Sequence, residues 1–136
     1  MDTWLIYNFT GGKVHATSVS QAAMTIFYTF TTHNWNWDYC ELANLNPKAM
    51  PSIKPDMYEY GTLTSDIIGA EIPILSNIAD QHAALFCQGC LSPGKAKGTI
   101  GTGFFFDVNI GYDPVFVRGY KTAYCWEVGE DRKSVV

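Results

Sequence analysis

Residues 72–111 read IPILSNIADQHAALFCQGCLSPGKAKGTIGTGFFFDVNIG and carry the clearest structural signals in the chain. Residues 71–79 form a short apolar run rich in isoleucine, which is typical of a buried strand. Residues 81–91 are apolar on almost every face and predict a helix that ends at Ser92-Pro93-Gly94. A strand that leads directly into a helix is typical of an α/β fold.

The second half of this segment predicts a β-hairpin. Residues 96–100 and 104–110 are strand-like runs, and Gly101-Thr102-Gly103 lies between them as a turn. The order is therefore strand, helix, hairpin. Because only one strand precedes the helix, we expect the rest of its sheet to come from residues outside the chain.

The flanking sequence predicts further helices, loops and one strand. In chain order these are a helix at 2–9, a short helix at 39–45, a proline-rich loop at 47–55 and an aromatic strand at 122–128. Gly11-Gly12 should end the first helix, because glycine is common just past a helix C-terminus. Asp38 is a candidate N-cap for the second helix.

The composition is that of a globular protein. Hydrophobic residues make up 47% of the chain and charged residues 16%, which is too apolar for a disordered protein. The net charge is −4 and the nine Lys and Arg residues are scattered, so we expect neither nucleic acid nor an acidic membrane surface as a partner. No apolar run reaches the roughly 20 residues that span a bilayer, and the start lacks the pattern of a secretory signal. We expect a cytoplasmic protein.

Cysteine and histidine spacing does not predict a metal site. Cys87-x-x-Cys90 has no second pair of ligands at zinc-binding spacing, so packing is the favoured interpretation. His15, His33 and His82 are not spaced as a metal site or a catalytic triad, and no role is assigned to them.

Asp80 lies where the predicted strand gives way to the helix, and ligand sites of α/β sheets collect at the carboxyl ends of strands. One interpretation is that Asp80 is only an N-cap. The other is that its carboxylate accepts the proton of a substrate hydroxyl, with the helix dipole favouring the negative charge. Gln81 beside it offers both a donor and an acceptor, which suits a polyol.

Gly101-Thr102-Gly103 also has two interpretations. Most such tripeptides are ordinary tight turns. The alternative is a turn whose glycines let backbone amides and the Thr102 hydroxyl approach phosphate oxygens. It is not a Walker loop, because the required G-x-x-x-x-G-K-[ST] spacing is absent.

The segment resembles, without a gap, a run of the FGGY-type carbohydrate kinases, in particular their glycerol-kinase-like members. In that family an Ile-Pro strand leads to Asp-Gln-Gln-x-Ala-Leu-Phe-Gly-Gln and then to Lys-x-Thr-x-Gly-Thr-Gly-x-Phe. Residues 2–25, DTWLIYNFTGGKVHATSVSQAAMT, also resemble the Asp-Thr-Trp-Leu segment of this family. The similarity is closest to the divergent animal glycerol-kinase-like branch, which also has Ala before the Asp.

By this resemblance, Asp80 is the catalytic base and an acceptor contact, Gln81 is a second polyol contact, and Phe105 packs against the acceptor's carbon backbone. Gly101-Thr102-Gly103 corresponds to a phosphate-binding hairpin in which Thr102 contacts the ATP phosphates. The resemblance also implies ATP and Mg²⁺ as cofactors, with the metal ligand outside this chain and no metal site within it.

The family fold has two actin-like, ribonuclease-H-like α/β domains around a cleft, of which the chain is expected to be an incomplete part. Residues 1–92 correspond to the C-terminal part of the acceptor-binding N-terminal domain, and residues 93–136 to the beginning of the ATP-binding C-terminal domain. The implied function of the full-length parent is ATP-dependent phosphorylation of a polyol or sugar hydroxyl. Its expected partners are that small molecule, ATP and a second copy of itself in a homo-oligomer.

The chain also departs from the family pattern. His82 and Cys87 stand where the family commonly has Gln and Gly, and Ser18, Gln21 and Met24 replace Asp, Asn and Arg. The family's Asp-Gly-Thr phosphate loop, its other acceptor contacts and its adenine-binding glycines have no counterpart here. We therefore expect the chain alone to be inactive as a kinase. The alternative hypothesis is a catalytically dead kinase remnant that acts as a binding module.

Overall fold

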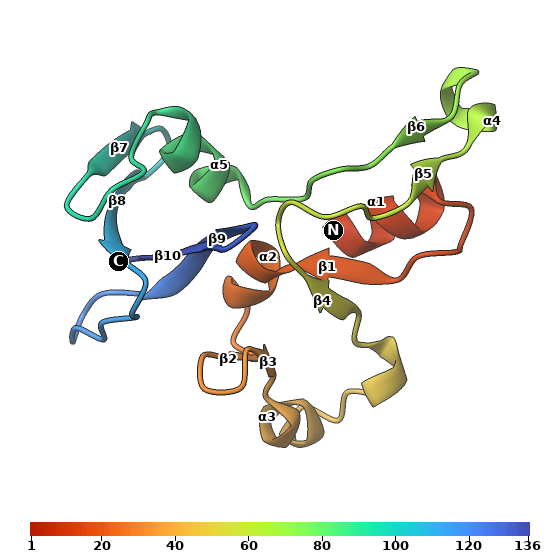
Figure 1. Ribbon diagram of the computed structural model, residues 1–136. Coiled ribbons are helices and arrows are strands. Elements are labelled where there is room, and N and C mark those ends of the chain that lie inside the picture. The colour runs from red at the N-terminus through yellow and green to blue at the C-terminus, as the bar shows by residue number, and fades with distance from the viewer.

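All residues, 1–136, are described by the computed structural model of the chain, in which short helices alternate with strands. The helices are α1 (Asp2–Phe9), α2 (Val19–Ala23), α3 (Trp37–Leu42), the 3-10 helix η1 (Pro47–Ala49), α4 (Ser65–Ile68) and α5 (Asp80–Cys87). The strands are β1 (Ala16–Ser18), β2 (Tyr28–Thr29), β3 (Asn34–Trp35), β4 (Ser52–Lys54), β5 (Thr62–Leu63), β6 (Ile72–Pro73), β7 (Ala96–Ile100), β8 (Phe104–Gly111), β9 (Ala123–Val128) and β10 (Asp131–Val135). In Figure 1, the group formed by α1, β1, β4, β5, β6 and α4 lies on one side, α5, β7 and β8 lie on the other, and α2 and β9 lie between them. None of the helices combines the length and the apolar character that crossing a bilayer requires.

A four-stranded antiparallel sheet in the order β7-β8-β10-β9 dominates the C-terminal half. The predicted hairpin is confirmed, because β7 pairs with β8 from Ala96↔Val108 to Ile100↔Phe104. The predicted strand at 122–128 corresponds to β9. The polar sequence of β10, DRKSV, did not predict a strand. It forms one because both of its edges are paired, one with β8 and the other with β9.

Helix α5 is shorter than predicted, since it ends at Cys87 and not at residue 91. Gly89 has a φ of +74°, a left-handed conformation that glycine adopts without a steric penalty. The N–H of Cys90 donates to the carbonyl of Leu85, and the N–H of Gly89 donates to that of Phe86. This is a Schellman motif. The glycine therefore ends the helix one turn before the Ser-Pro-Gly sequence that was expected to end it.

Residues 71–79 do not form the predicted buried strand. Only β6 is a regular strand; it pairs with β5, and Ser76 bridges to Met57 farther along. Ile72 is 48% exposed and Leu75 is 55% exposed. An apolar run becomes a buried strand only when other elements cover its faces, and here the run pairs along one edge with residues 57–63 and has no second neighbour.

The N-terminal half follows the prediction at α1 and departs from it farther on. Helix α3 has Asn36 as its N-cap, whose side chain accepts the N–H of Tyr39. Asp38 lies inside the helix, so its predicted N-cap role is wrong. The expected proline-rich loop contains η1 and also β4, which pairs in parallel with β1. Pro51 and Pro55 lie just outside β4, where they remove no ladder hydrogen bond.

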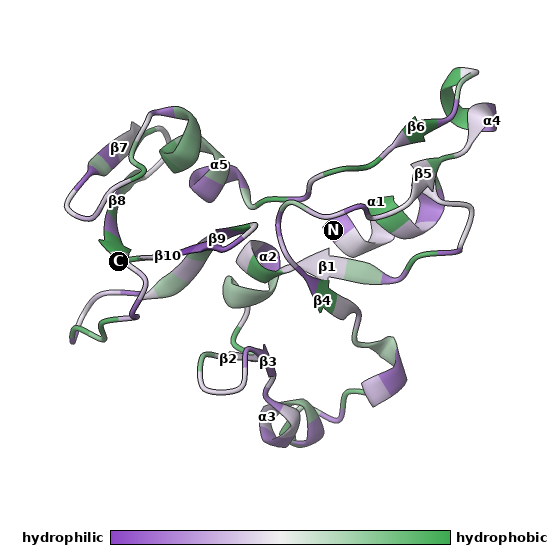
Figure 2. Cartoon of the chain, viewed as in Figure 1, coloured by the Kyte–Doolittle hydropathy of each residue, from purple (hydrophilic) through white to green (hydrophobic).

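The main hydrophobic core joins α2 and the end of α5 to the sheet. It contains 13 buried residues. Leu85, Cys125 and Trp126 within it are completely buried, at 0% exposure. Figure 2 shows that the hydrophobic residues of α4 and β6 lie at the far tip of the chain, away from this core. The second half of α5 packs into this core through Leu85, and this contact helps to fix the position of the whole helix.

Candidate functional site

Asp80 is the first residue of α5, and its side chain is exposed. The N-cap position belongs to Ala79 and no side chain caps the helix, so the interpretation of Asp80 as an N-cap is wrong. One carboxylate oxygen accepts the backbone N–H of Gln81 at 2.7 Å. The other oxygen makes no hydrogen bond within the chain and can accept one from a bound hydroxyl.

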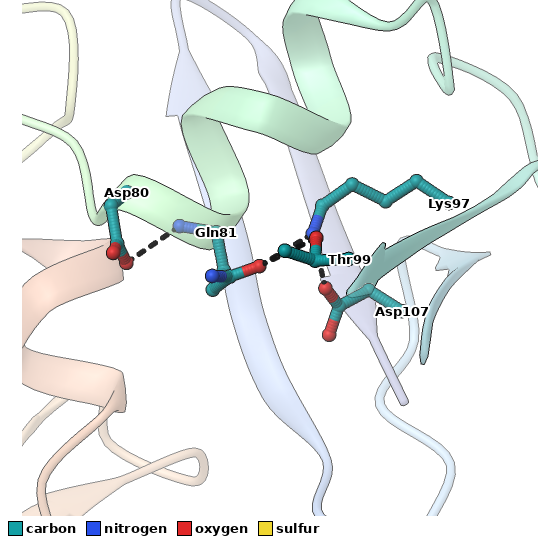
Figure 3. Close-up of polar contacts among 5 residues, drawn as sticks. All are labelled: Asp80, Gln81, Lys97, Thr99 and Asp107. Carbon is teal, nitrogen blue, oxygen red and sulfur yellow. Dashed lines mark hydrogen bonds and ion pairs between the residues drawn. The ribbon is translucent and has the colours of Figure 1, made fainter. Parts of the chain in front are cut away.

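Gln81 is connected to the hairpin through a buried lysine. The Nζ of Lys97 in β7 donates to Gln81 Oε1 at 2.6 Å, to Thr99 Oγ1 at 2.9 Å and to Asp107 Oδ2 at 2.7 Å. Thr99 Oγ1 in turn donates to Gln81 Oε1 at 3.2 Å. The Lys97 side chain has no exposed surface, and Asp107 in β8 neutralises its charge. Figure 3 shows this group bridging the first turn of α5 and the hairpin.

None of Lys97, Thr99 and Asp107 was assigned a site role from the sequence. A signal for them exists, because residues two apart on a strand share a face. Lys97 and Thr99 are such a pair, and Asp107 is the residue directly opposite Lys97 in the hairpin register.

Gly101-Thr102-Gly103 forms the tip of the hairpin, as predicted. The N–H of Gly101 donates to the carbonyl of Gly103 at 2.9 Å, and the amides of Thr102 and Gly103 have no intramolecular partner. All three residues are exposed. Free amides and a free hydroxyl are compatible with a phosphate contact and with an ordinary turn, so the phosphate role stays a prediction.

A cavity of ≈ 580 Å³ lies between the first turn of α5, β8 and the residues around β9. Its lining includes two predicted acceptor contacts, Gln81 and Phe105, together with His82, Asp107 and Lys121. Phe105 is 56% exposed, which leaves its ring free to pack against a ligand. Asp80 and the Gly101–103 turn lie outside this lining. The structure therefore brings Gln81 and Phe105 together in one cavity and leaves the other predicted site residues outside its lining.

Two buried titratable groups flank the start of α5. Asp56 accepts the N–H of Ser20 at 3.2 Å and that of Glu127 at 2.7 Å, and Ser20 Oγ accepts the N–H of Ala79 at 2.9 Å. This chain of contacts fixes the residue before Asp80. Burial raises the pKa of Asp56 to about 6. Burial lowers the pKa of His82 to about 4, and its Nδ1 has no hydrogen-bond partner.

Asp56 and His82 should make opposite contributions to the pH dependence of stability. The folded pKa of Asp56, about 6, lies above the ordinary 3.8, so its contribution is complete below pH 3.8 and is lost as the pH rises to 6. The folded pKa of His82, about 4, lies below the ordinary 6.5, so its contribution is complete above pH 6.5 and is lost as the pH falls to 4. Each contribution amounts to about 3 kcal/mol.

We therefore expect the stability of Asp56→Asn to rise between pH 4 and pH 6 and that of His82→Gln to fall, while the unsubstituted chain changes less than either. Urea unfolding of the three proteins at several pH values in this range measures the slopes. Slopes of the same sign in the two variants would contradict the opposed contributions.

The structure contains no cluster of metal-binding side chains. No three His, Cys, Asp or Glu side chains lie close enough together to hold an ion. Cys87 is exposed and Cys90 is buried, so only the second packs in the way expected of both.

Comparison with known proteins identifies relatives that match most of the chain. Residues 1–87 match the model of the N-terminal domain of the FGGY family of carbohydrate kinases. The glycerol kinase of Thermoanaerobacter pseudethanolicus is 46% identical over 131 residues, covering 94% of this chain and 26% of the relative. That of Pseudothermotoga lettingae is 44% identical over 111 residues, covering 82% of this chain and 22% of the relative. The crystal structure of Plasmodium falciparum glycerol kinase with ADP matches with a TM-score of 0.90 and 32% identity, over 98% of this chain and 27% of that one. The chain thus spans about a quarter of the length of these relatives.

Proposed function

Because the chain belongs to the FGGY family of carbohydrate kinases and has the α/β, actin-like fold of its sugar kinases, we propose that it forms part of an ATP-dependent kinase that phosphorylates a hydroxyl of a polyol or sugar. Glycerol is the first acceptor to test, because the two relatives described above are glycerol kinases. The observation that carries the proposal is the pair of hydrogen bonds that Lys97 and Thr99 donate to the side-chain oxygen of Gln81. It joins the predicted acceptor contacts and the predicted phosphate hairpin into one unit.

In this proposal the free oxygen of Asp80 accepts the proton of the acceptor hydroxyl as the γ-phosphoryl group is transferred. Such a transfer needs mostly positioning and charge stabilisation from the protein. Gln81 makes the second polar contact and the exposed ring of Phe105 packs against the carbon backbone. The free amides of the Gly101–103 turn and the Thr102 hydroxyl bind phosphate oxygens. Ligands for Mg²⁺ come from residues outside this chain.

A chimera tests the proposal. The chain replaces the matching segment of the Thermoanaerobacter pseudethanolicus glycerol kinase, which it resembles over 131 residues. ADP formation is then measured with glycerol, other polyols and sugars, and the parent kinase is the control. We expect turnover with at least one polyol or sugar. A folded chimera that binds ATP but turns over none of the panel would contradict the proposal.

The same chimera separates the alternative hypothesis, a catalytically dead binding module. That hypothesis predicts binding of the polyol, measured by calorimetry, without ADP formation.

We further propose that the domain boundary lies near residue 92, that the isolated chain does not turn over ATP, and that the complete protein is cytoplasmic and homo-oligomeric.

A further inference from the structure

The hydrogen bonds around Gln81 fix which of its two amide atoms is available to a ligand. An ammonium group has three donors and no acceptor, so the Gln81 atom facing Lys97 is its oxygen. That oxygen also accepts from Thr99, which occupies its second lone pair. The amide nitrogen makes no hydrogen bond within the chain, and Figure 3 shows it on the side facing away from Lys97. Gln81 can therefore offer a ligand only a donor.

Lys97 itself is held by three hydrogen bonds in a buried position. Its three protons are used by Gln81, Thr99 and Asp107 at 2.6, 2.9 and 2.7 Å. Its side chain has no exposed surface, and a buried charge is held in place by its counter-ion, here Asp107. The position of the Gln81 amide is thus set by a fully paired buried cation, not by solvent.

The backbone that carries these groups includes the hairpin of the phosphate turn. Lys97 and Thr99 lie on one face of β7, and Lys97 pairs directly with Asp107 across the hairpin. Residues 88–95 separate α5 from β7 in the chain. The Lys97 and Thr99 contacts are consequently the direct polar connections from the side chain of Gln81 to the strand that leads into Gly101-Thr102-Gly103.

We propose that Lys97 is a positioning residue that fixes Gln81 as a hydrogen-bond donor toward a polyol oxygen. This inference rests on the proposed function and specifies how the same site recognises its ligand. Asp80 is an acceptor only, and Gln81 is a donor only. The pair therefore suits a ligand with a hydroxyl proton directed at Asp80 and the oxygen of a neighbouring hydroxyl directed at Gln81.

The test is the affinity of the chimera for glycerol, measured by calorimetry without ATP. Lys97→Met should raise the Kd for glycerol about tenfold, since one well-placed hydrogen bond is equivalent to roughly a five- to tenfold change in affinity. Lys95→Met is the matched control, because Lys95 is exposed and lies two residues earlier, and its Kd should not change. Equal Kd values for Lys97→Met and the unsubstituted chimera would overturn the proposal.

A double substitution distinguishes positioning from a merely structural role. If Lys97 acts through Gln81, Lys97→Met should add nothing to the Kd of Gln81→Met. In turnover assays it should raise the glycerol KM and leave kcat within about twofold, because the lost contact is uniform binding. A lower kcat at constant KM, or a further rise in Kd in the Gln81→Met background, would show a structural role and overturn the inference.

Thr99 provides a variant that keeps the buried ion pair and the fold. Thr99→Val removes one donor to the Gln81 oxygen and should raise the Kd about threefold, whereas Thr99→Ser should not change it. An unchanged Kd in Thr99→Val also contradicts the proposal. The Kd measurements test binding only, so they can be interpreted even if the chimera shows no turnover. In that case the proposed kinase function would fail, and the positioning role of Lys97 would still be tested.

Discussion

Replacing Asp80 by asparagine is expected to lower the kcat of the chimera by about 10²- to 10⁴-fold, the usual contribution of a positioned general base. The amide of asparagine has nearly the same shape, and it loses the negative charge and the oxygen that accepts the proton. Asp80 is exposed and makes a single hydrogen bond to its own neighbour, so its replacement should leave the fold intact. Steady-state ADP formation at saturating glycerol measures the effect.

The matched control for this substitution is Asp66→Asn. Asp66 is also an exposed aspartate in the first turn of a helix, α4, and it lies away from the hairpin. Its replacement should leave kcat within about twofold, because exposed substitutions outside a site are nearly neutral. If Asp80→Asn retained a third or more of the original kcat, Asp80 would not be the general base, and another group would have to accept the proton of the hydroxyl.

The local elements of the fold could be predicted where a sequence signal is sufficient by itself. The hairpin of β7 and β8 follows from two strand-like runs around a glycine turn, and α1 follows from helical spacing ended by Gly11-Gly12. Prediction failed where the outcome depends on distant partners. Residues 71–79 are apolar and yet half exposed, and polar β10 is a strand between two neighbours. Hydrophobic pattern alone cannot tell which faces and edges will be covered.

The candidate site divides in the same way. Once the turn pairs Ile100 with Phe104, the register places Lys97 opposite Asp107, so this ion pair could have been predicted from the hairpin. The hydrogen bond from Lys97 to Gln81 could not have been predicted in this way, because it depends on how α5 packs over the sheet. Asp80 shows the limit of local rules in another way. An aspartate that precedes a helical run usually predicts an N-cap. Here the N-cap is Ala79, and Asp80 is the first residue of the helix.

One buried side chain against which α5 packs on the sheet is Trp126 of β9. Its ring has no exposed surface and meets the ring of Phe86 edge-on, with centroids 5.3 Å apart. Its Nε1 also donates to Asp131 at 3.2 Å. It is thus one of the contacts, together with the buried Leu85, through which the C-terminal turn of α5 packs against the sheet, while Lys97 binds the N-terminal turn.

Trp126→Ala is therefore expected to lower the free energy of unfolding by about 3–5 kcal/mol, the usual cost of removing a large aromatic side chain from a core. The loss combines the buried area, the cavity left behind and the aromatic pair with Phe86. Urea unfolding of the complete 136-residue chain measures it, and Trp4→Ala is the control, because Trp4 is 66% exposed and should cost less than about 1 kcal/mol. Similar losses for the two tryptophans would show that α5 is not held by Trp126. The orientation of Asp80 and Gln81 would then depend on the remaining contacts, which are the buried Leu85, Lys97 and the Asp56–Ser20–Ala79 hydrogen bonds.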